Sequence, residues 1–189
     1  GASSETAREM GNWLDQRVYD LRLRASPYVV SDNLARASGR SGAQAVGRLR
    51  DYLNSVRQNL SAHDGLAILS PDGQMLTNSG SRTGFRLSQD QLNNLRTRDA
   101  LAGDAYWDTG VNKPVIILVV PIRRDDGLFL GALSAKVNLS GLIDVLREHA
   151  TDVRRVYAIT EQGRLVISSA GNSADVMKTT VPTAVMREL

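Results

Sequence analysis

The sequence predicts an α+β protein in which a long N-terminal helix packs along an antiparallel sheet. Two observations lead to this prediction. From about Glu5 to Ser26, apolar residues recur at intervals of three and four, as on one face of an amphipathic helix. From residue 66 onward this period gives way to short apolar runs separated by turn residues, as in strands joined by hairpins. Helices therefore come first in the chain, and the sheet follows.

The helical part contains a break. Pro27 ends the first helical pattern, and a short helical piece leads into a loop marked by Gly39 and Ser41. A second amphipathic helix then runs from about Gly42 to Asn59. Two helices are thus expected before any strand.

The first strands form a hairpin. The apolar run 66–69 and the segment 74–79 flank Ser70-Pro-Asp-Gly73, which supplies the backbone angles of a tight turn. Ser88, with Gln91 three residues later, caps a short helix. The segment 106–113 that follows this helix has few apolar repeats and is expected to contain a turn.

A second hairpin is expected to form the centre of the sheet. The continuous β-branched run 114–122 is typical of a strand that is buried on both faces. A polar loop at 123–127 connects it to a strand at 128–137, and a helix capped by Asn138 or Ser140 follows to about residue 149.

The last part of the chain repeats the first hairpin. Residues 157–169 align without a gap on residues 67–79, with Gly163 on Gly73. This repeat predicts a second, smaller sheet that begins near residue 151. The alternative is that any two hairpins have turn residues at similar positions, in which case the alignment does not indicate a repeat.

The composition is that of a folded, water-soluble chain. Its 189 residues are enough for one domain and part of a second, and 42% of them are hydrophobic. The net charge is only +3 and the basic residues form no concentrated tract, which argues against a nucleic-acid partner. The absence of cysteine excludes disulfides and thiolate chemistry. No apolar run approaches the roughly 20 residues that cross a bilayer.

Three stretches resemble the Cache family of extracellular sensors, whose sheet is PAS-like. Residues 66–79 are similar to the family's strand pair around an Asp-Gly turn, and residues 100–116 are similar to its short helix and ligand-facing loop. Residues 121–142 are similar to its closing hairpin. The resemblance spans roughly residues 10 to 170 and implies a double Cache arrangement.

This resemblance implies three parts. Residues 1–62 would be the N-terminal helical segment, residues 63–150 the membrane-distal PAS-like module, and residues 151–189 the start of a smaller membrane-proximal module. The chain would be the periplasmic, ligand-sensing domain of a bacterial transmembrane receptor. It would not be an enzyme and would hold no cofactor, and a histidine kinase, nucleotide cyclase, phosphatase or chemotaxis output would lie across the membrane.

A homodimer is also implied by the resemblance. The stripe of Met10, Trp13, Arg17 and Leu21 on the first helix would either form the dimer seam or cover the helix's own sheet.

Six residues lie on the elements that border the pocket in sensors of this shape. Amino-acid-binding Cache domains hold the ligand carboxylate with an arginine and aromatic residues on the short helix, and the ammonium with an aspartate on the late strand. Here that helix lacks the aromatic neighbours, and Lys136 stands where the aspartate is expected, which argues against an amino-acid ligand. The six candidates are Arg96, Arg98, Tyr106, Trp107, Asp108 and Lys136.

The chemistry of these candidates leaves alternatives open. If Lys136 and one of the arginines face inward, they need a counter-charge, and a carboxylate or another anion is the expected small-molecule ligand. Otherwise all three cations are solvated. Of Tyr106 and Trp107, one must point inward because side chains alternate along an extended segment. Asp108 would orient a ligand hydroxyl or amine, or only cap the turn after it.

No catalytic or metal-binding constellation is evident. His63 and His149 lack partners at any motif spacing, and no phosphate-binding loop is present. Two rival hypotheses remain: a cytosolic PAS- or GAF-like interaction and dimerisation domain without a small ligand, and a hydrolase whose polar cluster is assembled only in space.

Overall fold

The computed structural model describes residues 2–60, 63–80, 86–103 and 105–146. The predicted module at 151–189, with the repeated hairpin at 157–169, lies outside the described residues, as does His149. Among the helices that are described, none is long and apolar enough to cross a membrane.

Three helices precede the first strand, one more than the sequence pattern predicts. The short helical piece after Pro27 is a helix of nine residues with Pro27 as its N-cap residue. It is separate from the helix before it because proline cannot continue that helix. The helices are α1 (Ala2–Ala25), α2 (Tyr28–Arg36) and α3 (Gly42–Arg57).

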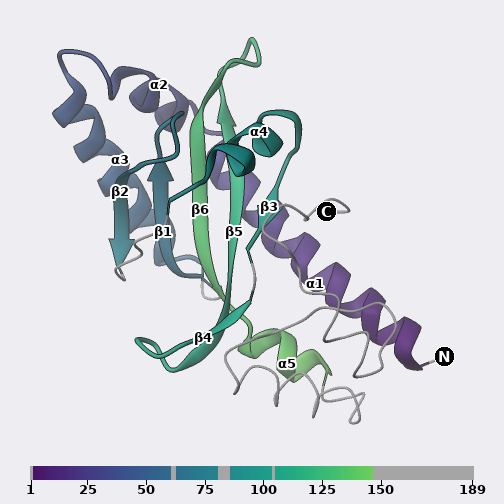
Figure 1. The fold of residues 1–189 in the computed structure, drawn as a ribbon. Helices are drawn as coiled ribbons and strands as arrows, with labels where there is room; N and C mark the ends of the chain where they lie inside the picture. Colours follow the sequence, from purple (N-terminus) through teal and green to yellow (C-terminus); the bar gives the residue numbers. More distant parts are fainter. Residues whose placement is uncertain (1, 61–62, 81–85, 104, 147–189) are drawn as a thin grey trace.

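The strands form one antiparallel sheet in the order β2-β1-β6-β5-β3, with β4 also paired to β5 (Figure 1). Both predicted hairpins are present, and the longest strands, β5 and β6, lie next to each other near its centre. The strands are β1 (His63–Leu69), β2 (Met75–Gly80), β3 (Leu101–Ala102), β4 (Tyr106–Asp108), β5 (Lys113–Arg123) and β6 (Phe129–Asn138).

The strands β3 and β4 were not expected from the sequence. They contain two and three residues, too few to show an alternating pattern of their own. They exist because β5 is long enough to pair with both, through Leu101 opposite Val119 at one end and Tyr106 opposite Val115 at the other.

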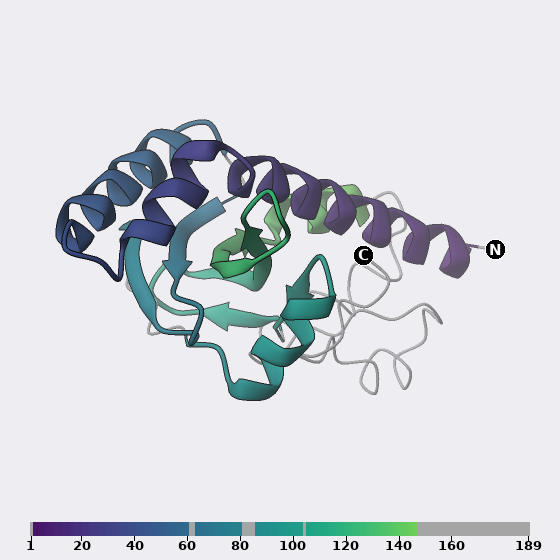
Figure 2. The same ribbon diagram turned by 90° about the horizontal axis from the view of Figure 1, so that it is seen from above.

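Helices cover the sheet unequally (Figure 2). The first three helices lie on one side, whereas α4 (Gln89–Thr97) lies on the other. Successive side chains of β5 therefore enter different cores. Ile116 and Leu118 belong to the core that includes residues of the first three helices, and Ile117 and Val119 belong to the core that includes residues of α4. We call these two sides of the sheet the helix face and the α4 face.

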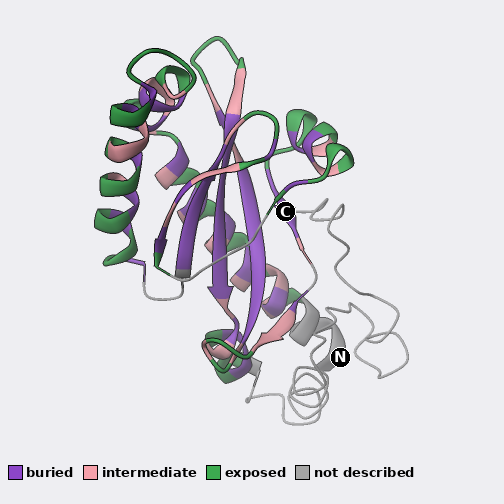
Figure 3. Cartoon of the chain, turned by 60° about the vertical axis from the view of Figure 1, so that its left-hand side comes forward, coloured by how far each residue is buried: buried purple, intermediate pink, exposed green. Residues whose placement is uncertain are grey.

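Burial on both faces explains the uninterrupted apolar run of β5, which Figure 3 shows as a buried strand. The predicted cap of α4 is also confirmed. The Ser88 side chain accepts a hydrogen bond from the Gln91 amide, and the Gln91 side chain accepts one from the Ser88 amide.

The apolar stripe of α1 covers the chain's own sheet. Met10, Leu14, Val18 and Leu21 are buried in the helix-face core, and the Arg17 guanidinium stacks over the Trp13 ring at 5.0 Å. Met10 and Leu21 thus cover the chain's own sheet, as one of the two alternatives states, and have no surface to offer a dimer partner.

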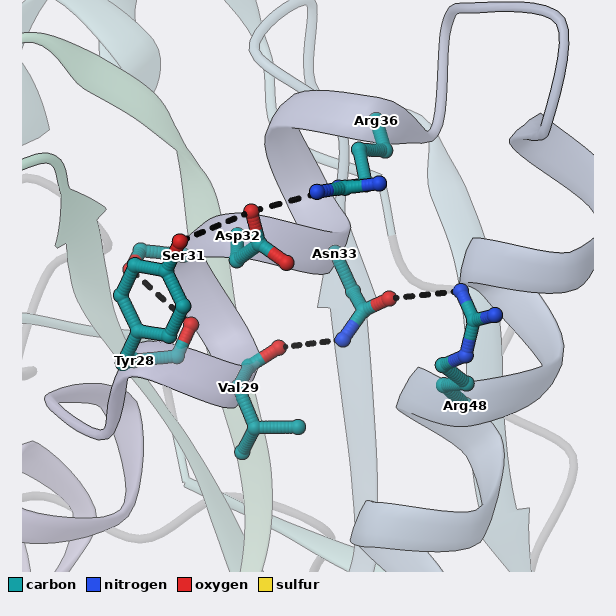
Figure 4. Close-up of polar contacts among 7 residues, drawn as sticks. All are labelled: Tyr28, Val29, Ser31, Asp32, Asn33, Arg36 and Arg48. Atoms are coloured by element: carbon teal, nitrogen blue, oxygen red, sulfur yellow. Dashed lines mark hydrogen bonds and ion pairs between the residues drawn. The ribbon is translucent and has the colours of Figure 1, made fainter.

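A buried amide joins α2 to α3 (Figure 4). The Asn33 side chain donates to the Val29 carbonyl at 2.8 Å and accepts from the Arg48 guanidinium at 3.4 Å. Both ends of the amide are thus satisfied, which a buried polar group requires.

The strand β6 leads directly into α5 (Ser140–Leu146). The side chain of Asn138 accepts a hydrogen bond from the Ser140 amide at 2.8 Å, which is the predicted cap. The Leu139 amide donates to the Pro114 carbonyl at 2.8 Å, so the start of α5 is fixed to the end of β5.

Two glycine substitutions test this packing. Gly131 has a φ of +149°, and a Cβ there would collide with the Leu69 carbonyl oxygen, whereas a Cβ at Gly47 in α3 meets nothing within 4 Å. Gly131→Ala should lower the free energy of unfolding by more than about 1 kcal/mol. Gly47→Ala should raise it by about 0.5–1 kcal/mol because alanine favours a helix. Urea unfolding followed by circular dichroism measures both, and a stable Gly131→Ala variant would contradict the β1–β6 pairing.

Candidate ligand-binding site

A buried ion pair joins two of the six candidate residues. Lys136 lies on β6 and Asp108 on β4, and the Lys136 Nζ is 2.5 Å from the Asp108 Oδ2. The two side chains are 5% and 13% exposed. The sheet thus brings together a base and an acid that are 28 residues apart in the sequence.

Lys136 lies on the α4 face of the sheet. Its neighbours Ala135 and Val137 belong to the helix-face core, so Lys136 points to the opposite side. Across the strands it stands opposite Gly65 on one side and Ile117 on the other. The next residues on this face are the small Ala67 and Ser134, which also stand opposite each other.

The turn after β4 holds Asp108 independently of Lys136. The Asp108 Oδ1 accepts hydrogen bonds from the amides of Gly110 at 2.8 Å and Val111 at 3.3 Å. The hydrogen bond from Lys136 lowers the pKa of Asp108, and these two amides lower it further against the effect of burial. Asp108 is therefore ionised at neutral pH and also caps its turn, as one of the two predictions for this residue states.

The ammonium of Lys136 is less fully paired than the carboxylate. A protonated lysine has three N–H donors. Within the described part of the chain, the hydrogen bond to Asp108 is the one that it forms. Two donors of a nearly buried cation are therefore left for a further acceptor.

The two aromatic candidates point in different directions, as strand alternation predicts. Tyr106 lies on the same side of β4 as Asp108 and packs with the α4-face core. Burial raises the pKa of Tyr106, while the Lys136 charge acts against this rise. Trp107, between Tyr106 and Asp108, faces the other way and is half-buried. Tyr106 is thus the aromatic residue that borders the ion pair.

The arginines of α4 do not join this pair. Arg96 is exposed and its guanidinium stacks on the Phe129 ring at 4.7 Å. Arg98 is also exposed, and its backbone carbonyl accepts a hydrogen bond from Arg123 at 3.0 Å. The arrangement in which an arginine faces inward beside Lys136 is therefore not formed, and the counter-charge of Lys136 is Asp108.

The sequence reasoning missed Arg123. Its guanidinium donates to the carbonyls of Leu95, Arg96 and Arg98 at the end of α4 and forms an ion pair with Asp99 at 3.6 Å. Free carbonyls at a helix C-terminus attract a cation. Arg123 therefore fixes α4 against β5, and only the folded position of β5 reveals this role.

Two surface hollows lie away from the ion pair, and neither is lined by any of the six candidates. An apolar one of about 300 Å³ lies between the end of α2 and the turns of the two hairpins. A polar one of about 290 Å³ is lined by Arg22, Asp99 and Arg123, among others.

The ion pair makes stability depend on pH in acid. The folded pKa of Asp108 lies below the ordinary value of about 3.9, so its contribution is present above that value and is lost as pH falls through the lowered pKa. At pH 7, Asp108→Asn should lower the free energy of unfolding by about 1.5–3 kcal/mol. Urea unfolding from pH 3 to 7 should show this difference shrinking below about pH 4.

The exposed Asp125 provides the matched control. Asp125→Asn should change the free energy of unfolding by less than about 0.5 kcal/mol at every pH. A difference between wild type and Asp108→Asn that stays constant in acid would show that the carboxylate charge does not stabilise the fold.

Known structures share this fold. The sensor domain of the Vibrio cholerae histidine kinase DctB superposes with a TM-score of 0.58 at 13% identity, over 76% of this chain and 55% of that one. The extracellular domain of the putative histidine kinase vpHK1S-Z8 gives 0.56 at 17% identity, over 77% and 59%. The ligand-binding domain of the Campylobacter jejuni chemoreceptor Tlp3 in complex with L-valine gives 0.54 at 15% identity, over 77% and 60%.

The chain thus spans less than two thirds of the length of these neighbours. No curated protein sequence matches it. A family profile does match, over residues 2–189, and its description is "Double sensory domain of two-component sensor kinase". This match favours the sensor over both rival hypotheses, the cytosolic interaction domain and the hydrolase. The predicted fold class and resemblance are confirmed, and the chain belongs to the double Cache family of extracytoplasmic sensor domains.

Proposed function

We propose that this domain binds a small molecule carrying a carboxylate, or a similar anionic acceptor, at Lys136 on the α4 face. The observation behind the proposal is a nearly buried ammonium in the centre of the sheet that, among the described residues, forms one hydrogen bond, to Asp108. A charge-assisted hydrogen bond is stronger where water is excluded, so such a cation is an effective anchor for a carboxylate.

The other candidates have different places in this proposal. Tyr106 and Asp108 border Lys136 and belong to the proposed site, and Ile117 and Ala67 are the apolar residues near it on the α4 face. Trp107, Arg96 and Arg98 face away or are exposed, and we assign them no ligand contact.

Neighbouring structures support a small-molecule ligand. The Tlp3 domain is in complex with L-valine, and the ligand-binding domain of the Pseudomonas aeruginosa chemoreceptor PctC is in complex with GABA. Both ligands are small and carry a carboxylate. In the proposed site, Lys136 on β6 holds the carboxylate of the ligand.

Transmission would begin at β6. Lys136 stands four residues before α5, whose first turn is fixed to β5 through Leu139 and Pro114. A ligand that favours one packing of β5 and β6 would shift the population of α5 positions. We propose that this shift passes to a cytoplasmic output domain of a membrane-anchored, homodimeric receptor. Tyr19 and Leu23 on the outer side of α1, 57% and 49% exposed, provide an apolar surface for the dimer.

A thermal-shift screen tests the ligand proposal. The probes are carboxylates, amino acids, amines and nucleobases, applied to the wild type and to two variants, Lys136→Met and Arg98→Met. A carboxylate at about 100 times its Kd should raise the Tm of the wild type by several degrees. Lys136→Met should lose this shift because it removes the donors, while Arg98→Met should keep it because Arg98 is exposed.

Two outcomes would contradict the proposal. One is an undiminished carboxylate shift in Lys136→Met, which would place the ligand elsewhere. The other is a wild type that no probe in the library stabilises.

A further inference from the structure

The two ends of the ion pair differ in their access to water. Lys136 lies within β6, between β1 and β5, and 5% of its side chain is exposed. Asp108 is the last residue of the short strand β4, and Thr109 and Gly110, which follow it, are exposed. The Asp108 side chain, 13% exposed, therefore lies nearer to solvent than that of Lys136.

Asp108 also has partners that would remain if it left Lys136. Its Oδ1 keeps the amides of Gly110 and Val111, which belong to the same turn. Lys136 has no such reserve, because Asp108 is its one hydrogen-bond partner in the described part of the chain. Opening the pair would thus leave the carboxylate with two hydrogen bonds and leave a buried cation in need of an anion.

From this asymmetry we infer that Asp108 is a built-in competitor of the ligand, occupying the place on Lys136 that the ligand's carboxylate takes. In the ligand-free domain Asp108 neutralises Lys136. When a carboxylate binds, Asp108 loses its hydrogen bond from Lys136 and keeps the hydrogen bonds within its own turn. The inference rests on the proposed function, since it requires the ligand to bind at Lys136.

Competition of this kind sets the affinity. The apparent Kd equals the intrinsic Kd divided by the fraction of molecules in which Lys136 is free. A strong internal pair keeps that fraction small, so the domain responds only to a ligand that outcompetes Asp108. Displacing Asp108 also releases the side-chain link between β4 and β6, which gives the binding event a structural consequence.

In the opposite assignment, Asp108 is a ligand contact that accepts a hydrogen bond from an amine or a hydroxyl of the ligand. The two assignments predict opposite signs for the same substitution. A competitor weakens the binding of a carboxylate, so its removal tightens binding. A contact strengthens binding, so its removal weakens it.

The experiment uses isobutyrate and its uncharged analogue isobutyramide as probes, titrated into the domain and followed by NMR. Asp108→Asn should bind isobutyrate about tenfold more tightly than the wild type or better, because Lys136 has lost its internal anion. The affinity for isobutyramide should change far less, since an uncharged ligand does not replace the Asp108 carboxylate as the counter-charge of Lys136. The double variant Asp108→Asn/Lys136→Met should lose the gain. Asp108→Ser serves as the second variant, because a serine hydroxyl can also accept a hydrogen bond from the amides of the turn.

The outcomes separate the inference from the proposed function. Weaker binding of isobutyrate to Asp108→Asn, with binding still abolished by Lys136→Met, would overturn the inference and leave the Lys136 site standing. Binding that Lys136→Met does not affect would overturn the site itself. Absence of isobutyrate binding to both Asp108 variants, with their folding verified by circular dichroism, would also overturn the inference.

Discussion

The pairing of β5 with β6 is the constraint on which the rest of the structure depends. Its register places Ile117 opposite Lys136 and Leu118 opposite Ala135. Because side chains alternate along a strand, this register sends Leu118 into the helix-face core and Lys136 to the α4 face. A slip of one residue would turn Lys136 into an apolar core that offers it no partner. The fold and the candidate site are therefore fixed by the same set of backbone hydrogen bonds.

Stability alone does not explain why the sheet contains this ion pair. Desolvating two charges costs free energy, and apolar side chains of similar volume would pack as well or better. What the pair provides is a charged donor inside the sheet that two apolar residues could not supply. The two residues have unequal surroundings, since Lys136 lies deep in the sheet and Asp108 lies at the end of an edge strand. We therefore expect the pair to open by a movement of Asp108 and not of Lys136.

The sequence predicted the elements that local patterns specify. The Asp-Gly hairpin, the Ser88 capping box and the buried strand β5 are all present, because turn angles, caps and apolar runs are set by neighbouring residues. The strands β3 and β4 were missed since only pairing with β5 creates them.

For the candidate site, too, the sequence could predict some features and not those that depend on strand pairing. The structure brings together Lys136, Asp108 and Tyr106, three of the six residues that the resemblance to known sensors singled out, and their role in binding stays a prediction. The sequence could not show that Lys136 and Asp108 pair, because the contact joins two strands 28 residues apart. Nor could it decide between an inward and a solvated position for Arg96 and Arg98; the structure shows both to be exposed.

The central claim, that the ligand binds on the α4 face, is tested most directly by NMR of isoleucine δ1-methyl groups. Among the described isoleucines, Ile117 lies on the α4 face, whereas Ile68, Ile116, Ile122 and Ile143 belong to the helix-face core. Adding the carboxylate that stabilises the domain most should shift the Ile117 signal strongly and that of its neighbour Ile116 little. A shift of Ile116 and Ile68 with Ile117 unchanged would place the ligand on the other side of the sheet and contradict the account.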